Sequence, residues 1–126
     1  MKRVTGIGGI FFKTNDPEAL TRWYQEHLGI ELDPQGYVSF EWRDKDDPSH
    51  KGSTAWAPFP ADTDYFKPSS KPFMINYRVE NLDYVLEQLR KEGVTVEDRI
   101  QNEPYGRFAW LTDPEGNRIE LWEPRN

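Results

Sequence analysis

The amino-acid sequence contains one long internal repeat. The segment Ile10–Asp16 resembles the segment Ile75–Asn81, and each is followed by an amphipathic stretch that ends at a glycine, Gly29 or Gly93. A repeat unit of half the chain is longer than the roughly 20–50 residues that are typical of solenoid proteins. The repeat therefore predicts two similar half-domains, and the joint between such halves is a natural position for a ligand cleft.

Each half carries the signals of one helix. Asp16 and Asn81 are predicted N-cap residues, because their side chains accept hydrogen bonds from the free N–H groups of a first turn. Apolar residues then recur at helical spacing, namely Leu20, Trp23, Tyr24 and Leu28 in the first half and Leu82, Val85, Leu86 and Leu89 in the second. Gly29 and Gly93 follow these stretches, and glycine readily adopts the left-handed conformation that ends a helix.

Strand-like runs surround each predicted helix. They are Ile7–Thr14, Ile30–Leu32, Tyr37–Trp42 and Ser53–Pro58 in the first half, and Phe73–Val79, Val94–Glu97, Arg107–Thr112 and Arg118–Glu123 in the second. Thr112–Asn117 is predicted to be a hairpin turn, because proline suits a type I turn and the glycine after it adopts a positive φ. The predicted order is one strand, one helix and three strands, twice over.

A proline-rich segment separates the two halves. We therefore divide residues 1–126, taken as a single domain, into module one at about 5–58, a linker at 59–72 and module two at about 73–124. The linker carries three aromatic residues, Phe59, Tyr65 and Phe66. Because a solvated linker has little use for aromatic rings, we expect this segment to pack over the mouth of the cleft.

Charge and composition narrow the classes of partner. The formal net charge is −6, and no basic stripe of the kind that binds nucleic acid is present. No stretch approaches the roughly 20 apolar residues of a membrane span, and Met1–Asp16 lacks a signal-peptide pattern. The chain has no cysteine, which excludes disulfides and thiolate chemistry. We expect a soluble, cytoplasmic protein that binds a small molecule, and the acidic balance favours a cationic one.

The motifs resemble those of the vicinal oxygen chelate superfamily, the glyoxalase, bleomycin-resistance and extradiol dioxygenase fold. They are Asn15-Asp16-Pro17 with Trp23-Tyr24 and Leu28-Gly29, the run Tyr77–Asp83, and the tail Phe108–Pro124. The resemblance implies an α+β fold in which two βαβββ modules form an open, U-shaped mixed sheet around a cleft, with the helices outside. It also implies a homodimer, since members commonly build sites between paired modules. The fold serves lyases, isomerases, dioxygenases and drug-binding proteins, so it does not choose the function.

Members that use a metal place its ligands on the first and last strands of each half. The equivalent positions here are Gly9, Thr54, Met74 and Glu120. Only Glu120 is a good ligand for a divalent ion, because glycine has no side chain, threonine is weak and methionine suits soft Cu(I). We therefore expect no cofactor, with an unusual metal site as the alternative. We interpret His27 and His50 as exposed residues and leave open whether either reaches the cleft.

Glu120 is the candidate general base. Alternation along its strand puts Arg118, Glu120 and Trp122 on one face, and a carboxylate beside an aromatic ring tends to have a raised pKa. The equally weighted alternative is a structural ion pair with Arg118, Arg107 or Arg78. The same alternation assigns these residues to the ligand cleft: Phe11, Thr54, Trp56, Met74, Asn76, Trp110 and Trp122.

Two hypotheses of different class follow. In the first, the protein binds a small aromatic or cationic compound, as the resistance branch does without a metal. In the second, it is a glyoxalase-like lyase, isomerase or dioxygenase that uses Glu120 as a base, or an unusual metal with few protein ligands. The poor ligand set favours binding, whereas the retained Glu120 favours chemistry.

Overall fold

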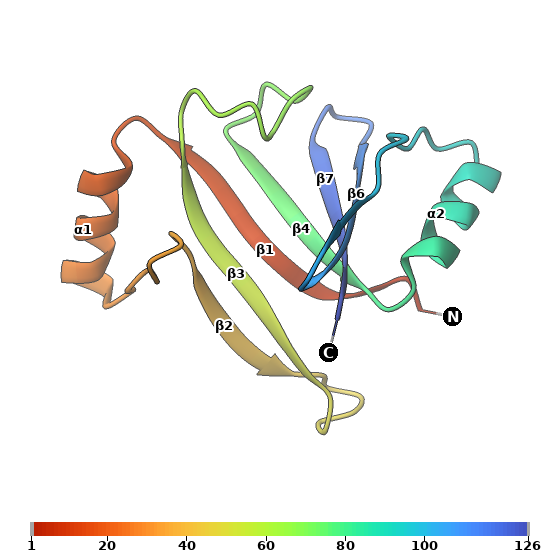
Figure 1. Ribbon diagram of the computed structural model, residues 1–126, viewed down its shortest axis with the longest axis horizontal. Helices are drawn as coiled ribbons and strands as arrows, with labels where there is room; N and C mark the ends of the chain where they lie inside the picture. The colour runs from red at the N-terminus through yellow and green to blue at the C-terminus, as the bar shows by residue number, and fades with distance from the viewer. Residues whose placement is uncertain (1, 126) are drawn as a thin grey trace.

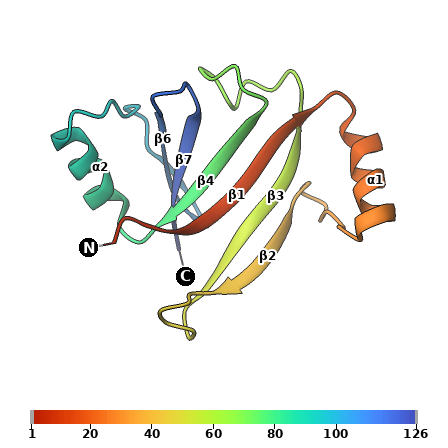
Figure 2. The same cartoon turned by 180° about the vertical axis from the view of Figure 1, so that it is seen from behind.

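The computed structural model describes residues 2–125 and contains one seven-stranded sheet and two α-helices (Figure 1). In chain order the elements are β1 (Val4–Thr14), α1 (Pro17–Leu28), β2 (Val38–Arg43), β3 (Lys51–Pro60), β4 (Phe73–Val79), α2 (Leu82–Lys91), β5 (Gln101–Glu103), β6 (Gly106–Thr112) and β7 (Arg118–Pro124). The sheet is open and curved, and the two helices lie at opposite sides of the molecule (Figures 1 and 2). This arrangement confirms the predicted α+β class, with a mixed open sheet and the helices outside.

The two halves meet at the centre of the sheet. The strand order is β2-β3-β1-β4-β7-β6-β5, and β1 pairs antiparallel with β4. On either side of this joint the pairing is parallel, β1 with β3 and β4 with β7. The repeat in the sequence therefore appears as two equivalent strand pairs around the joint.

Two predicted strands are absent. Ile30–Leu32 is irregular, because the segment after Gly29 runs directly into a turn in which the Asp33 carboxylate accepts from the N–H of Gln35 at 2.9 Å. In the second half, only Val96 of the predicted strand Val94–Glu97 pairs, through a single bridge to Leu111. The short strand β5 pairs with β6 instead. The first half therefore has three strands and the second has four.

The helix signals are confirmed. The side chains of Asp16 and Asn81 accept from the backbone N–H groups of Ala19 and Tyr84 at 3.1 and 3.0 Å. Gly29 has a φ of +69° and ends α1.

The two helices pack differently. Leu82, Val85 and Leu86 of α2 are buried in the core, whereas α1 has no buried residue. Among the described residues, no helix combines the length and the apolar character that a membrane span requires. The second half therefore holds most of the core, and the site described next lies in this half.

Candidate functional site

Glu120 lies at the centre of the second half, and its side chain is buried. The residue on β7 is 1% exposed and pairs with Asn76 of β4 on one side and Trp110 of β6 on the other. Asn76 Nδ2 donates to Glu120 Oε1 at 2.6 Å, and Trp110 Nε1 donates to Oε2 at 2.9 Å. The strand register therefore supplies two of the hydrogen-bond donors to this carboxylate.

The third donor comes from the linker. The hydroxyl group of Tyr65 donates to Glu120 Oε2, and this bond joins residues that are 55 positions apart in the chain. Phe59 stacks on the Tyr65 ring with 5.7 Å between ring centroids, and Phe66 is completely buried. The linker therefore packs against the second half, as its aromatic content predicts.

Burial raises the pKa of Glu120, because the charged form loses its contact with water. The hydrogen bonds from Tyr65, Asn76 and Trp110 act in the opposite direction, since they stabilise the carboxylate, and the Arg118 charge adds a smaller effect of the same sign. Burial also raises the pKa of Tyr65, and the Glu120 charge raises it further. The tyrosine therefore keeps its proton, and the pKa of Glu120 lies above its ordinary value.

The ion pair that the structural alternative predicts for Glu120 is not formed among residues 2–125. Among residues 2–125, no arginine forms an ion pair with Glu120: Arg118 pairs with Glu97 at 2.7 Å, and Arg107 pairs with Asp83 at 3.0 Å. Arg78 instead places its guanidinium group over the rings of Trp42 and Trp122. The carboxylate is held by neutral donors alone, which favours a protonation equilibrium at this position over a fixed ion pair.

The structure brings five of the seven predicted cleft residues together near Glu120. Asn76 and Trp110 touch its carboxylate. Met74 and Trp110 belong to a buried cluster with Phe66 and Phe108, against which further aromatic residues pack, including Phe11 and Trp122. This cluster fills the inner face of the sheet around the carboxylate.

Trp56 and Thr54 are the two exceptions. Trp56 packs against Tyr24 of α1 at 4.9 Å between ring centroids and therefore lies on the helix side of the sheet. The reason is the register of β1 with β3, which pairs Ala57 with Phe11, so that Ala57 occupies the inner face and its neighbour Trp56 the outer one. The Thr54 hydroxyl donates to the Ile7 carbonyl at 2.5 Å and accepts from Trp42. The prediction that Trp56 mirrors Trp122 in the cleft was wrong.

The residues at the superfamily's metal positions do not fit a divalent ion. The space beside Gly9 is occupied by the Phe11 ring, since a Cβ atom on Gly9 would lie 2.6 Å from it. Met74 is fully buried among aromatic residues, and the Thr54 hydroxyl is already bonded to the backbone and to Trp42. Within residues 2–125, no three His, Cys, Asp or Glu side chains are grouped in a way that could hold a metal, so neither His27 nor His50 completes a set.

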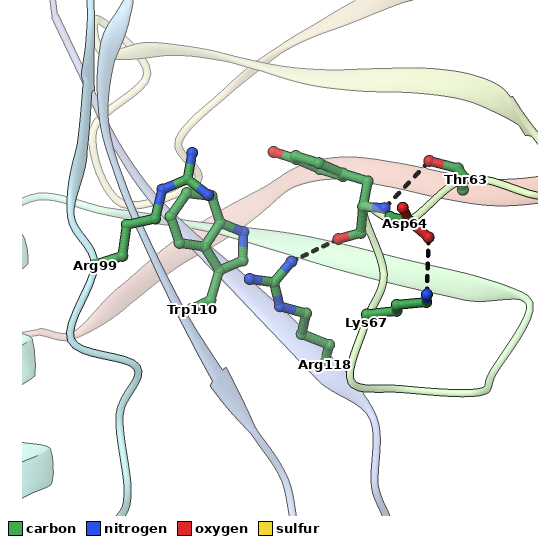
Figure 3. A pocket seen from close by; sticks show the side chains of 7 residues that line it. Thr63, Asp64, Lys67, Arg99, Trp110 and Arg118 are labelled. Carbon is green, nitrogen blue, oxygen red and sulfur yellow. Dashed lines mark hydrogen bonds and ion pairs between the residues drawn. The ribbon is translucent and has the colours of Figure 1, made fainter.

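A cavity of about 520 Å³ opens beside this network (Figure 3). We call it the linker cavity; it is lined by Thr63, Asp64, Tyr65 and Lys67 of the linker, by Arg99 before β5, by Trp110 of β6 and by Arg118 of β7. Tyr65 and Trp110, which donate to Glu120, form part of its wall. The sequence patterns indicate Trp110, Tyr65 and Arg118 but not Thr63, Asp64, Lys67 or Arg99, because these four residues lie in irregular segments that have no periodicity.

Comparison with known proteins identifies the family. The model of the Glyoxalase/Bleomycin resistance protein/Dioxygenase superfamily matches residues 6–121. No curated protein matches the chain in sequence.

Solved structures show the same fold at low sequence identity. Methylmalonyl-CoA epimerase from Mycobacterium tuberculosis is 20% identical with a TM-score of 0.62, and the match covers 100% of this chain and 92% of that one. A methylmalonyl-CoA epimerase from Streptomyces coelicolor in complex with 2-nitronate-propionyl-CoA is 19% identical with a TM-score of 0.63, covering 94% and 96%. A superfamily member from Vibrio splendidus 12B01 is 10% identical with a TM-score of 0.58, covering 92% and 96%.

Proposed function

Because the chain belongs to the Glyoxalase/Bleomycin resistance protein/Dioxygenase superfamily, we propose that it binds a small organic molecule in the linker cavity without a divalent metal ion. One observation carries this proposal: two residues of the cavity wall, Tyr65 and Trp110, both donate to the buried carboxylate of Glu120. The cavity therefore adjoins a buried carboxylate whose pKa is raised by burial. Perturbed groups beside cavities are typical of functional sites.

The size and lining of the cavity support a small ligand. Its volume of about 520 Å³ lies within the range of about 300–1,000 Å³ that is common for ligand pockets. Tyr65, which is 37% exposed, offers an aromatic ring to a ligand, whereas Trp110 is 1% exposed, and the remaining lining residues are polar or charged. This combination provides one aromatic contact together with groups that orient a ligand.

A ligand screen observed through the Trp110 indole N–H tests the proposal. A compound that binds in the linker cavity should shift this NMR signal in a saturable manner, because the indole group forms part of the wall. The indole signal of Trp23 is an internal control, since Trp23 is 49% exposed on α1 and lies outside the cavity. A screen in which every hit moves Trp23 and none moves Trp110 would overturn the proposal.

A second candidate function is proton transfer at carbon, of the isomerase or lyase type. The observation that favours it is the buried Glu120, because burial raises its pKa and a carboxylate with a raised pKa is a stronger base. Solved epimerases share the fold, and their complexes contain CoA esters. In this account Tyr65 moves away from the carboxylate when a substrate enters, and Glu120 takes a proton from the substrate carbon.

Deuterium exchange separates the two candidate functions. If Glu120 transfers protons, a ligand with an acidic C–H bond should exchange that hydrogen in D₂O with the wild-type protein. The exchange should be lost with Glu120→Gln, a change that keeps the size of the side chain. Binding that persists in both proteins without any exchange would leave binding alone as the function.

A further inference from the structure

We propose that the ligand of the linker cavity carries an anionic group, a carboxylate or a phosphate, and that Arg99 binds it beside the Trp110 ring. The inference rests on the proposed function, since it concerns the same cavity. It reverses the expectation of a cationic ligand that follows from the net charge of −6. Three of the seven lining side chains are cationic and only one is acidic, so the cavity is basic within an acidic protein.

The ion pairs of the three cationic lining residues show which positive charge remains unpaired among residues 2–125 and can bind a ligand. Arg118 donates through Nε and Nη2 to Glu97 at 3.0 and 2.7 Å, and through Nη1 to the Tyr65 carbonyl at 2.5 Å. Its side chain is only 9% exposed, so its charge is neutralised and its position is fixed.

Lys67 is also paired, although on the surface. Its ammonium group contacts the Asp64 carboxylate at 2.9 Å, and both side chains are largely exposed. These two residues therefore contribute little net charge to the cavity. Because an exposed pair of this kind is weak, Lys67 is free to turn towards a bound anion.

Arg99 is different. Its guanidinium group donates to the side-chain oxygen of Gln101, and within residues 2–125 it forms no ion pair with a carboxylate. It is therefore the one cation of the lining whose charge has no counter-charge in the described part of the chain. A guanidinium group without a carboxylate partner is suited to binding a carboxylate or a phosphate through its remaining N–H groups.

The Trp110 ring holds this group in place. The guanidinium carbon of Arg99 lies 5.2 Å from the ring centroid, and that of Arg118 lies 5.0 Å from it. Figure 3 shows both arginine side chains beside the Trp110 ring. Stacking and the bond to Gln101 restrict the rotamers of Arg99 before a ligand arrives, and such preorganisation lowers the entropic cost of binding.

This arrangement also orients the ligand. An anionic group at Arg99 leaves the rest of the molecule against Trp110 and Tyr65, the two wall residues that bond to Glu120. The structure therefore assigns Arg99 to recognition of charge and leaves Glu120 for contact with the uncharged part of the ligand.

Titrations with succinate and with inorganic phosphate test the inference. The Trp110 indole signal is followed at constant ionic strength in the wild-type protein, in Arg99→Gln and in Arg90→Gln. Arg90 is a matched control, because it is exposed on α2 and its replacement changes the net charge equally. Loss of a charge-assisted hydrogen bond should weaken binding by roughly ten- to a hundredfold in Arg99→Gln. Arg90→Gln should bind like the wild type.

The outcomes distinguish this inference from the proposed function. Saturable shifts with succinate alone identify a carboxylate ligand, and saturable shifts with phosphate alone identify a phosphate ester. Equal affinity in Arg99→Gln and in the wild type would overturn the role of Arg99. If neither anion moves the Trp110 signal but an uncharged compound does, the inference is wrong and the proposed function stands. If no compound of any charge moves it, both fail.

Discussion

The hydroxyl group of Tyr65, in the segment that joins the two halves, donates to the buried carboxylate of Glu120 on β7. Tyr65 itself is 37% exposed, so one residue connects the interior of the site with the solvent. This contact fixes the linker over the second half of the sheet. A ligand in the linker cavity can therefore interact with Glu120 in two ways. Either Tyr65 moves aside, or the ligand forms a hydrogen bond to the Tyr65 hydroxyl, which itself bonds to Glu120.

We predict that Tyr65→Phe destabilises the protein by about 1–3 kcal/mol, because a buried carboxylate loses one of its three donors. The ring and its stacking on Phe59 are kept, so the change isolates the hydroxyl group. Urea unfolding measures the free energy of unfolding. Tyr105→Phe is the matched control, since Tyr105 is 58% exposed. Equal stability of the two variants would show that the hydroxyl contact is unimportant.

The pH dependence of stability provides a test of Glu120. Its pKa in the folded protein is raised above the ordinary value of 4.5, so the folded state keeps this proton when the unfolded chain has already lost it. The stabilisation is therefore complete below pH 4.5 and is lost as the pH rises towards the pKa of the folded state. Each tenfold difference in proton affinity corresponds to about 1.4 kcal/mol.

Glu120→Gln should remove this dependence. The free energy of unfolding of the variant, minus that of the wild type, should increase as the pH rises from 4.5, because glutamine does not titrate. Glu115→Gln, at an exposed turn position, should show no such trend. Chemical denaturation at several pH values measures the difference. A difference that stays constant with pH would mean that the pKa of Glu120 is not raised.

Local signals made much of the fold predictable. The side chains of Asp16 and Asn81 bond to backbone N–H groups three residues further along the chain, and Gly29 ends α1 through its own backbone conformation. These roles therefore follow from sequence position alone. Alternation along β7 also placed Glu120 and Arg118 on the face that lines the site. Trp56 was misplaced, because the face of a strand depends on its register with a distant strand, here β1. One shift of register moves every side chain to the other face.

Two contacts that define the site, Tyr65 with Glu120 and Arg99 with Trp110, could not be predicted from local sequence patterns. Tyr65 meets Glu120 only because the linker folds back over β7, and the sequence shows its aromatic rings but not their partners. Arg99 stands in an irregular stretch after α2, where no periodicity indicates direction. Its place beside Trp110 depends on the path of the whole chain between α2 and β5.

We also predict that the protein forms a homodimer at micromolar concentration. The side chains of Val4, Ile7, Ile10 and Phe73, on β1 and β4, are between 38% and 43% exposed. These strands run between the two helices when the molecule is seen from behind (Figure 2). Exposed apolar residues on paired strands favour association. Light scattering coupled to size-exclusion chromatography should give twice the chain mass, and a monomer across this range would contradict the prediction.

The dependence of ligand binding on metal shows whether the protein binds its ligand without a divalent ion. A compound that shifts the Trp110 indole signal is titrated against protein dialysed with EDTA and against protein supplied with Mg²⁺, Mn²⁺ or Zn²⁺, with the metal content measured by elemental analysis. We predict the same dissociation constant in all samples and no stoichiometric metal, because Gly9, Thr54 and Met74 are poor ligands. Binding that vanishes with EDTA and returns with about one metal ion per chain would contradict it.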